Sequence, residues 1–158
     1  TGGFVMGPDG KRYLIGNEKL AHCGALMLWL GNSPLVIVVR FLWELRRIAK
    51  LCKALGRTVT LISGEHEFVS FSADVAIIQV QSGVAIDLSR ASEVIIYSMN
   101  YSYFDHDQVK FRIRSYHGTF ARYHYLIAEN TIDEDIFKSQ VEKLSLATLL
   151  IDRHRRPK

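Results

Sequence analysis

The chain has 158 residues, of which 48% are hydrophobic and 23% charged, and its formal net charge is +4 at pH 7. This composition is ordinary for one soluble globular domain and excludes long disorder. The longest apolar run, residues 25–30, is far too short to span a bilayer. The first residue is Thr and no signal-peptide pattern follows, which indicates a fragment excised from a longer protein. The basic charge is compatible with a nucleic-acid partner without demanding one.

The N-terminal part predicts a small hairpin followed by a helix. Residues 3–15 predict the hairpin, because apolar segments flank a Gly-Pro-Asp-Gly turn at 7–10. Asn17 stands where it can cap a helix over about residues 18–30. Residues 1–33 are therefore assigned to an N-terminal hairpin and the first helix of the domain.

From Pro34 onward, apolar strands alternate with helices. Residues 35–39 form a β-branched run typical of a buried parallel strand. Residues 42–55 predict a helix that Gly56 ends. Its predicted inward residues are Leu45, Ile48, Ala49 and Cys52, and its predicted outward residues are Glu44, Arg46, Arg47, Lys50 and Lys53. Further strands are predicted at 59–62, 75–80, 94–97 and 123–128, with a helix around 108–115.

A final helix is predicted from the capping-box sequence at 131–134 to about residue 150. Together the elements predict an α/β fold, in which helices cover both faces of a parallel sheet. This domain occupies residues 34–152, and residues 153–158 form a basic, frayed tail. Ligands of such sheets collect at the carboxyl ends of the strands. The loops after Val39, Ile62, Val80 and Met99 are therefore where a functional site is expected.

One of these loops, residues 81–88, contains small residues around Gly83. Small residues let a backbone approach a phosphate or a nucleic-acid strand closely. Asp87 could hold a sugar hydroxyl or a loop amide. The alternative is an ordinary loop in which Asp87 stabilises a local turn, and the loop alone favours that alternative.

Gln108 and Arg112 are four residues apart, so they face the same way on a helix. An arginine held on a rigid helix can neutralise the charge of a transferring phosphate. A solvated polar face or a salt bridge is the alternative explanation.

In their order along the chain, these segments resemble the C-terminal RecA-like lobe of superfamily-two helicases, in the Swi/Snf-like DNA translocase branch. The resemblance covers nearly the whole chain, and the order of the motifs carries it. The matching segments are Glu18-Lys19-Leu20, Val36–Phe41 with Glu44-Leu45, Leu61–Gly64, Asp74–Leu88, Val94–Tyr97 with Asn100-Tyr101, Gln108 with Arg112, and Thr131–Ile136.

The chain departs from the pattern of that branch at several positions. Ser82 and Ala85 stand where the family has glycines, and Ser115 stands where it has a second arginine. Arg114 is adjacent but points about 100° away on an ideal helix. Either the helix is distorted there and Arg114 substitutes, or one arginine is absent. A His-Gly pair at 117–118 also replaces Gly-Gln, and these departures resemble a divergent member from a phage or mobile element.

The resemblance implies that ATP with Mg²⁺ binds between this lobe and an N-terminal RecA-like lobe of the same parent chain, which holds most of the nucleotide. The isolated chain is then inactive. The implied catalytic residues are Arg112 and Gln108. Arg112 stabilises the transition state, and Gln108 orients the Arg112 side chain or contacts the nucleotide. The implied cofactor-binding residues are Gly83, Asp87 and Arg114. The implied contacts with the DNA backbone are Arg40, Ser63, Gly64 and Ser82, and RNA stays open as the nucleic acid.

Other kinds of site find no support in the sequence. The six histidines show no HxxxH or HExxH spacing and the two cysteines form no CxxC pair, so no metal site is expected. Buried free thiols at Cys23 and Cys52 fit a reducing compartment, which favours a cytoplasmic or nucleoid-associated protein without a membrane partner.

Two alternative functions remain open. Ala85 and Ser115 motivate a degenerate, non-catalytic lobe that binds nucleic acid or protein. The other alternative is an unrelated α/β domain that binds a small ligand. An upstream GxxxxGK[ST] motif in the parent chain would separate the motor lobe from both.

Overall fold

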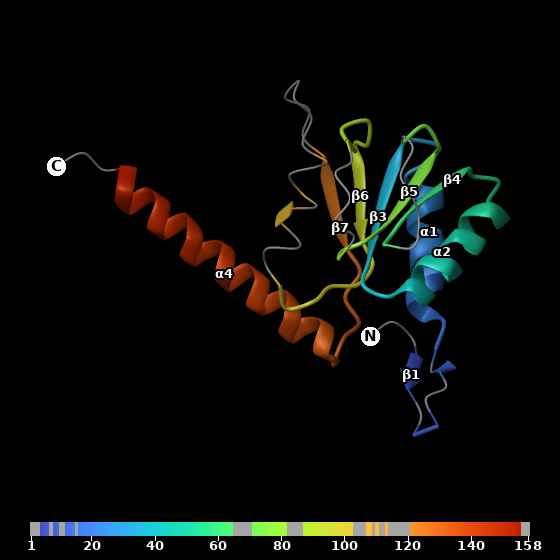
Figure 1. Ribbon diagram of the computed structural model, residues 1–158, viewed down its shortest axis with the longest axis horizontal. Helices are drawn as coiled ribbons and strands as arrows, with labels where there is room; N and C mark the ends of the chain where they lie inside the picture. Colours follow the sequence, from blue (N-terminus) through green and yellow to red (C-terminus); the bar gives the residue numbers. More distant parts are fainter. Residues whose placement is uncertain are drawn as a thin grey trace.

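The computed structural model describes residues 4–6, 8–9, 12–14, 16–64, 71–81, 87–102, 107–108, 110, 113 and 121–155. Five parallel strands form its main sheet in the order β4-β5-β3-β6-β7 (Figure 1). Their bounds are β3 (Leu35–Val39), β4 (Val59–Ile62), β5 (Val75–Gln79), β6 (Glu93–Ile96) and β7 (Arg122–Tyr125). The predicted parallel α/β sheet is confirmed.

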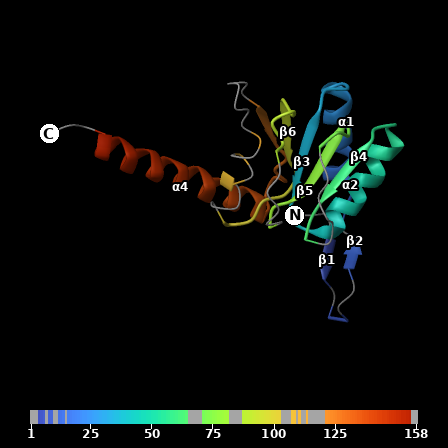
Figure 2. The same ribbon diagram turned by 45° about the horizontal axis from the view of Figure 1, so that its top comes forward.

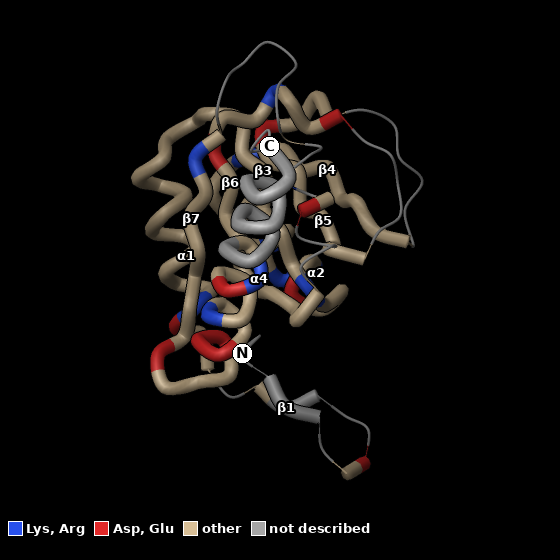
Figure 3. The backbone as a smooth tube through the Cα atoms, turned by 90° about the vertical axis from the view of Figure 1, so that its left-hand side faces the viewer, with Lys and Arg blue, Asp and Glu red and all other residues tan. Residues whose placement is uncertain are grey.

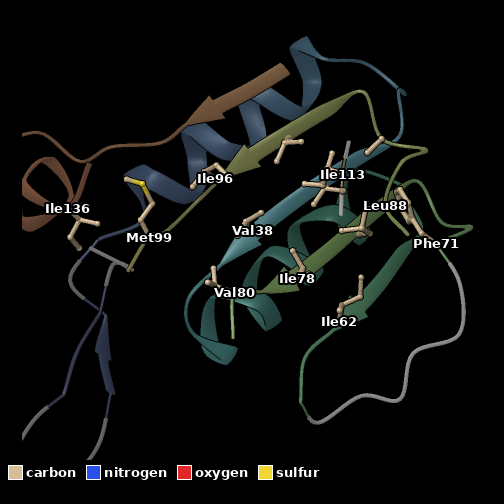
Figure 4. Packing of buried hydrophobic residues seen from close by; sticks show 14 residues of the cluster. Val38, Ile62, Phe71, Ile78, Val80, Leu88, Ile96, Met99, Ile113 and Ile136 are labelled. Carbon is tan, nitrogen blue, oxygen red and sulfur yellow. The ribbon is translucent and has the colours of Figure 1, made fainter. Parts of the chain in front are cut away.

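The central strand β3 is buried along its whole length, because both of its faces are covered. Val36 and Val38 point into a cluster with Ile78 and Ile96, which also takes up Ile113 and Ile136 (Figure 4). The other three residues of β3 point to the opposite face and a second cluster. A strand packed on both faces has no polar side, which is why its sequence is a continuous β-branched run.

Two helices cover that second face, α1 (Glu18–Trp29) and α2 (Leu42–Ala54) (Figure 1). The predicted inward residues of α2 are buried, namely Leu45, Ile48, Ala49 and Cys52. The prediction for Glu44 was wrong, since its side chain is only 1% exposed. Glu44 lies in the first turn of α2, where its carboxylate turns back to accept backbone N–H groups instead of reaching solvent.

The predicted cap of α1 is only partly confirmed. Asn17 occupies the N-cap position, but its side chain makes no capping hydrogen bond. Its Oδ1 instead accepts a hydrogen bond from the guanidinium of Arg47 on α2. The Asn17 side chain therefore joins two helices rather than closing the end of one.

The predicted N-terminal hairpin is present as β1 (Phe4–Met6) and β2 (Arg12–Leu14), which pair antiparallel. These strands form a separate two-stranded sheet, and Figure 2 shows them outside the main one.

The final helix α4 (Ile132–Arg155) begins beside the sheet and extends away from it (Figures 1 and 2). Thr131 Oγ1 accepts a hydrogen bond from the Asp133 N–H at 3.2 Å, as a capping residue does. Glu134 completes the cap on the N–H of Asn130 rather than that of Thr131. The helix continues to Arg155, so residues 153–155 of the predicted tail are helical. Within the described residues, no helix is long and apolar enough to cross a membrane.

Replacing Gly56 with alanine is expected to lower the free energy of unfolding by about 1–2 kcal/mol. Gly56 ends α2 with φ +72°, a left-handed conformation in which a Cβ atom is strained although there is space for it. Gly64→Ala is the matched control, because Gly64 also faces open space but does not have a positive φ. Urea unfolding of both variants measures the difference, and equal losses would contradict the role assigned to Gly56.

Candidate functional site at the carboxyl edge of the sheet

The carboxyl ends of the strands meet at one edge of the sheet, because all five strands run parallel. Arg40, Ser63 and Val80 directly follow β3, β4 and β5, and residues 97–100 follow β6. The start of α4 lies at this edge as well, and Figure 3 shows its acidic first turn close to basic positions. The first residues of the loops expected to carry a site are thus brought together.

The backbone of Arg40 is held from several sides. Its N–H donates to Ser98 Oγ at 2.7 Å and also lies 3.3 Å from Glu44 Oε2. Its carbonyl oxygen accepts a hydrogen bond from Gln79 Nε2 at 3.3 Å. The half-buried guanidinium lies over the ring of Phe41, 4.9 Å from the ring centroid.

Glu44 is the centre of this arrangement. Besides the Arg40 contact, its Oε2 accepts hydrogen bonds from Ser98 Oγ at 2.5 Å and from the Phe41 N–H at 3.1 Å. Burial raises the pKa of the Glu44 carboxyl above its ordinary value of 4.5, and the hydrogen bonds from Ser98 and Phe41 offset this only in part. The carboxylate is thus an acceptor that its surroundings push toward the protonated form.

The stability difference between the unmodified chain and its Glu44→Gln variant is expected to depend on pH. A raised folded-state pKa gives a contribution that is fully present below the unfolded-state pKa and is lost as pH rises through the folded-state pKa. The unmodified chain should therefore lose stability relative to the variant as pH rises above the ordinary carboxyl value of 4.5. Urea unfolding at a series of pH values measures it, and a difference that stays flat or changes in the opposite direction would contradict the raised pKa.

An ion pair joins α1 to the start of α4 near the same edge. Lys19 Nζ lies 2.5 Å from Asp133 Oδ2 and 5.4 Å from the centroid of the Tyr97 ring. Burial opposes ionisation of Asp133, but the pKa of its carboxyl is lowered on balance, and the hydrogen bond from Lys19 is the largest lowering cause. The pair lies beside a pocket of about 500 Å³, which Glu18, His22 and Glu129 also line. Lys19 and Asp133 thus neutralise each other and hold α1 against the start of α4.

Gln108 is exposed on the predicted helical segment, of which residues 107, 108, 110 and 113 are described. Ile113 anchors this segment in the core and is 1% exposed. Lys110 Nζ lies 5.7 Å and 5.9 Å from the ring centroids of Tyr123 and Tyr125 on β7. The segment thus packs beside β7 with Gln108 on its solvent side. The partners predicted with it, Arg112 and Arg114, lie outside the described residues, as do Ser82 and Gly83.

Asp87 takes the local role that was its alternative. Its Oδ1 accepts a hydrogen bond from the Ser89 N–H at 2.8 Å, and hydrogen bonds from the Ser89 side chain and backbone lower its pKa. In Figure 4 the neighbouring Leu88 lies next to Phe71, away from Val80 and Met99. The turn at Asp87 therefore lies toward the amino ends of the strands.

Ser63 and Gly64 differ in their access to a ligand. Ser63 is completely buried after β4, whereas Gly64 is exposed, with nothing within 4 Å of where a Cβ atom would stand. Gly64 is therefore accessible to a nucleic-acid backbone, whereas Ser63 is enclosed in the interior.

The sequence analysis missed three residues of this site, namely Glu44, Gln79 and Ser98. For Glu44 a signal was present, since a glutamate at the third position of a helix commonly reaches back to the N-cap N–H. Gln79 and Ser98 carry no such local signal, because their partner Arg40 is 39 and 58 residues away in sequence.

Comparison with known proteins defines the fold further. No family model and no curated protein matches the chain. Solved structures do match, 133 chains in all, among them the C-terminal part of the Fun30 ATPase domain. The two share 17% sequence identity with a TM-score of 0.67, over 77% of this chain and 44% of that one. The chain thus spans less than half of the matched chain, and its five parallel strands with flanking helices have the RecA-like fold found in the C-terminal part of that ATPase domain.

Proposed function

We propose that this chain is the second motor lobe of an ATP-dependent superfamily-two DNA helicase or translocase. The observation that carries the proposal is the RecA-like sheet, similar to the C-terminal part of an ATPase domain. The motif order along the chain, from Lys19-Leu20 to the segment at 131–136, supports the same branch of motors. The second motor lobe of such proteins works only with a first lobe, which the parent chain would supply.

ATP with Mg²⁺ would bind between the two lobes, and its transferring phosphate would supply the energy-yielding step. In the described part of the chain, no group of three His, Cys, Asp or Glu residues could hold a metal ion. In this proposal the first lobe would hold Mg²⁺. The exposed amide of Gln108, one turn before Arg112, suits the orientation of a phosphate or of that arginine.

In this proposal Arg112 neutralises charge that develops on the transferring phosphate. Gly83 lets its loop approach the nucleotide or the nucleic acid, and Arg114 supplies a second cation beside the nucleotide. The Asp87 carboxylate holds the turn at Ser89, and its predicted contact with the nucleotide would add to this local role.

The same edge of the sheet would contact the backbone of double-stranded DNA. Arg40 offers a guanidinium, and Gly64 and Ser82 offer loop backbone after β4 and β5. The buried Ser63 supports that loop from inside. Contacts of this kind read phosphates rather than bases, which fits a translocase that acts on any sequence.

The experiment that tests this function is ATP hydrolysis by the full-length parent protein, with and without double-stranded DNA. Strong stimulation of ATP hydrolysis by DNA supports the motor function. Stimulation by RNA and not by DNA would mean that the motor acts on RNA. The isolated chain should not hydrolyse ATP at all, since half of the cleft lacks the phosphate loop. Hydrolysis by the isolated chain would contradict the proposed division of work between lobes.

A degenerate binding lobe is the second candidate, favoured by Ser115 in place of the second arginine and Ala85 in place of a glycine. It predicts DNA binding by the parent without ATP hydrolysis, even when an upstream phosphate loop is intact. The same assay therefore separates the two functions.

A further inference from the structure

We propose that Glu44, Ser98 and Gln79 form a polar clamp that positions Arg40 against one phosphate of the nucleic-acid backbone. The inference rests on the proposed function, because it names residues that would make one of its DNA contacts effective. Glu44, Ser98 and Gln79 would touch no nucleic acid themselves and act only through Arg40.

The clamp reaches the backbone of Arg40 from three different elements. Ser98, beyond the end of β6, accepts the Arg40 N–H at 2.7 Å and donates to Glu44 Oε2 at 2.5 Å. Gln79, the last residue of β5, donates to the Arg40 carbonyl at 3.3 Å. Since β5 and β6 flank β3 on both sides, the N–H and the carbonyl of Arg40 are held by residues at or just beyond the ends of these two strands.

Glu44 makes this clamp costly in a way that packing alone does not explain. Its side chain is 1% exposed, and its second oxygen, Oε1, is buried without a hydrogen-bond partner. An unsatisfied buried polar atom destabilises a fold, so an apolar residue would serve packing better at this position. What a carboxylate adds is Oε2, which receives the Arg40 N–H, the Phe41 N–H and the Ser98 hydroxyl together.

The side chain of Arg40 differs from the other well-placed arginines. Arg57 and Arg90 donate to backbone carbonyls, and Arg122 pairs with Glu93. For Arg40, in contrast, the described part of the chain provides no carboxylate and no carbonyl to the guanidinium, which lies only over the Phe41 ring. Its planar set of N–H donors is left available at the edge of the sheet.

A phosphate is the ligand that this arrangement fits. A guanidinium binds a phosphate through two parallel hydrogen bonds, and this geometry depends on the direction of approach. Holding the backbone of Arg40 in advance removes part of the ordering cost of binding. An acidic protein surface could also bind this guanidinium. In that case the chain would not bind a DNA duplex.

The test begins with binding of the 158-residue chain to a fluorescein-labelled DNA duplex, followed by anisotropy over a series of salt concentrations. Arg40→Gln is expected to lower the magnitude of the negative slope of log K against log salt by about 0.9, the value for one lost phosphate contact. Lys53→Gln is the matched control. It removes the same charge from the exposed end of α2 and should leave the slope unchanged.

The clamp itself is tested with Ser98→Ala and Glu44→Ala. Each should lower the magnitude of the slope as Arg40→Gln does, although neither variant removes a positive charge. Glu44→Gln, which keeps an acceptor oxygen, should restore most of the slope lost in Glu44→Ala. Combining Ser98→Ala with Arg40→Gln should cause no further loss, because both act on one contact. Ser98→Ala answers the question if Glu44→Ala does not fold.

The outcomes separate the inference from the proposed function. If the unmodified chain does not bind the duplex at any salt concentration, its proposed DNA contact is wrong and the clamp falls with it. Suppose that Arg40→Gln lowers the magnitude of the slope. If Ser98→Ala alone leaves the slope unchanged, or lowers its magnitude further when combined with Arg40→Gln, DNA binding stands and the clamp is overturned. If Arg40→Gln leaves the slope unchanged, DNA binding stands but both Arg40 and its clamp are wrong.

Discussion

Replacing Arg112 with alanine in the full-length parent protein is expected to lower DNA-stimulated ATP hydrolysis by about 10³-fold or more. Losses of this size follow when an arginine that neutralises a transferring phosphate is removed from a motor or GTPase site. In the proposed function this arginine acts mainly in the transition state, so kcat should fall much more than the KM for ATP rises. Steady-state hydrolysis with saturating duplex DNA measures both quantities.

A matched control for this variant is Arg46→Ala, on the exposed surface of α2, which should hydrolyse ATP at the unmodified rate. Arg114→Ala resolves the question that Ser115 raises. A strong loss means that Arg114 takes the place of the second arginine, and an unchanged rate means that one arginine is used. If Arg112→Ala keeps the full rate while the unmodified protein is stimulated by DNA, the arginine-finger role of Arg112 is wrong.

The sequence predicted the inner strands of the sheet well because they are buried on both faces. Residues 35–39 are a run of five β-branched or aliphatic residues, and the structure has β3 with the same bounds. In β7 the agreement is weaker, since residues 123–128 were predicted and Arg122–Tyr125 form the strand. β7 is an edge strand with partly exposed side chains, so its sequence lacks the continuous apolar signal.

The sequence did not predict the partners of two polar side chains near helix ends, Glu44 and Asn17. Glu44 was placed outward by helical periodicity, which treats every carboxylate as a solvent-facing group. Its position in the first turn of α2 put free N–H groups within reach, and these compete with water for the carboxylate. Asn17 shows the reverse case, in which a guanidinium from α2 takes the side chain that the helix end would otherwise use.

The place of the candidate site could be predicted from the sequence, because parallel strands bring all their carboxyl ends to one edge. Its internal contacts could not be predicted. The bonds that hold Arg40 come from residues 39 and 58 positions further along the chain, and only the strand order β5-β3-β6 makes them neighbours. A single sequence gives the alternation of elements but not this order.

Replacing Ile37 with alanine is expected to lower the free energy of unfolding by about 2–5 kcal/mol. Ile37 is fully buried in the centre of β3, directly between Ile77 of β5 and Ile95 of β6. Because hydrogen-bonded strands fix these neighbours on both sides, the sheet cannot collapse into the space that the side chain leaves. Domains of this size are stable by about 5–15 kcal/mol, so the loss is a large part of the total.

Urea unfolding of the isolated chain measures this effect, with Ile132→Ala as the matched control. Ile132 carries the same side chain but is 52% exposed at the start of α4, so its loss should change stability by no more than about 0.5 kcal/mol. If Ile37→Ala does not fold, Ile37→Val should still fold and lose about 0.5–1.5 kcal/mol. Equal effects at Ile37 and Ile132 would contradict the central place of β3, on which the geometry of the Arg40 edge depends.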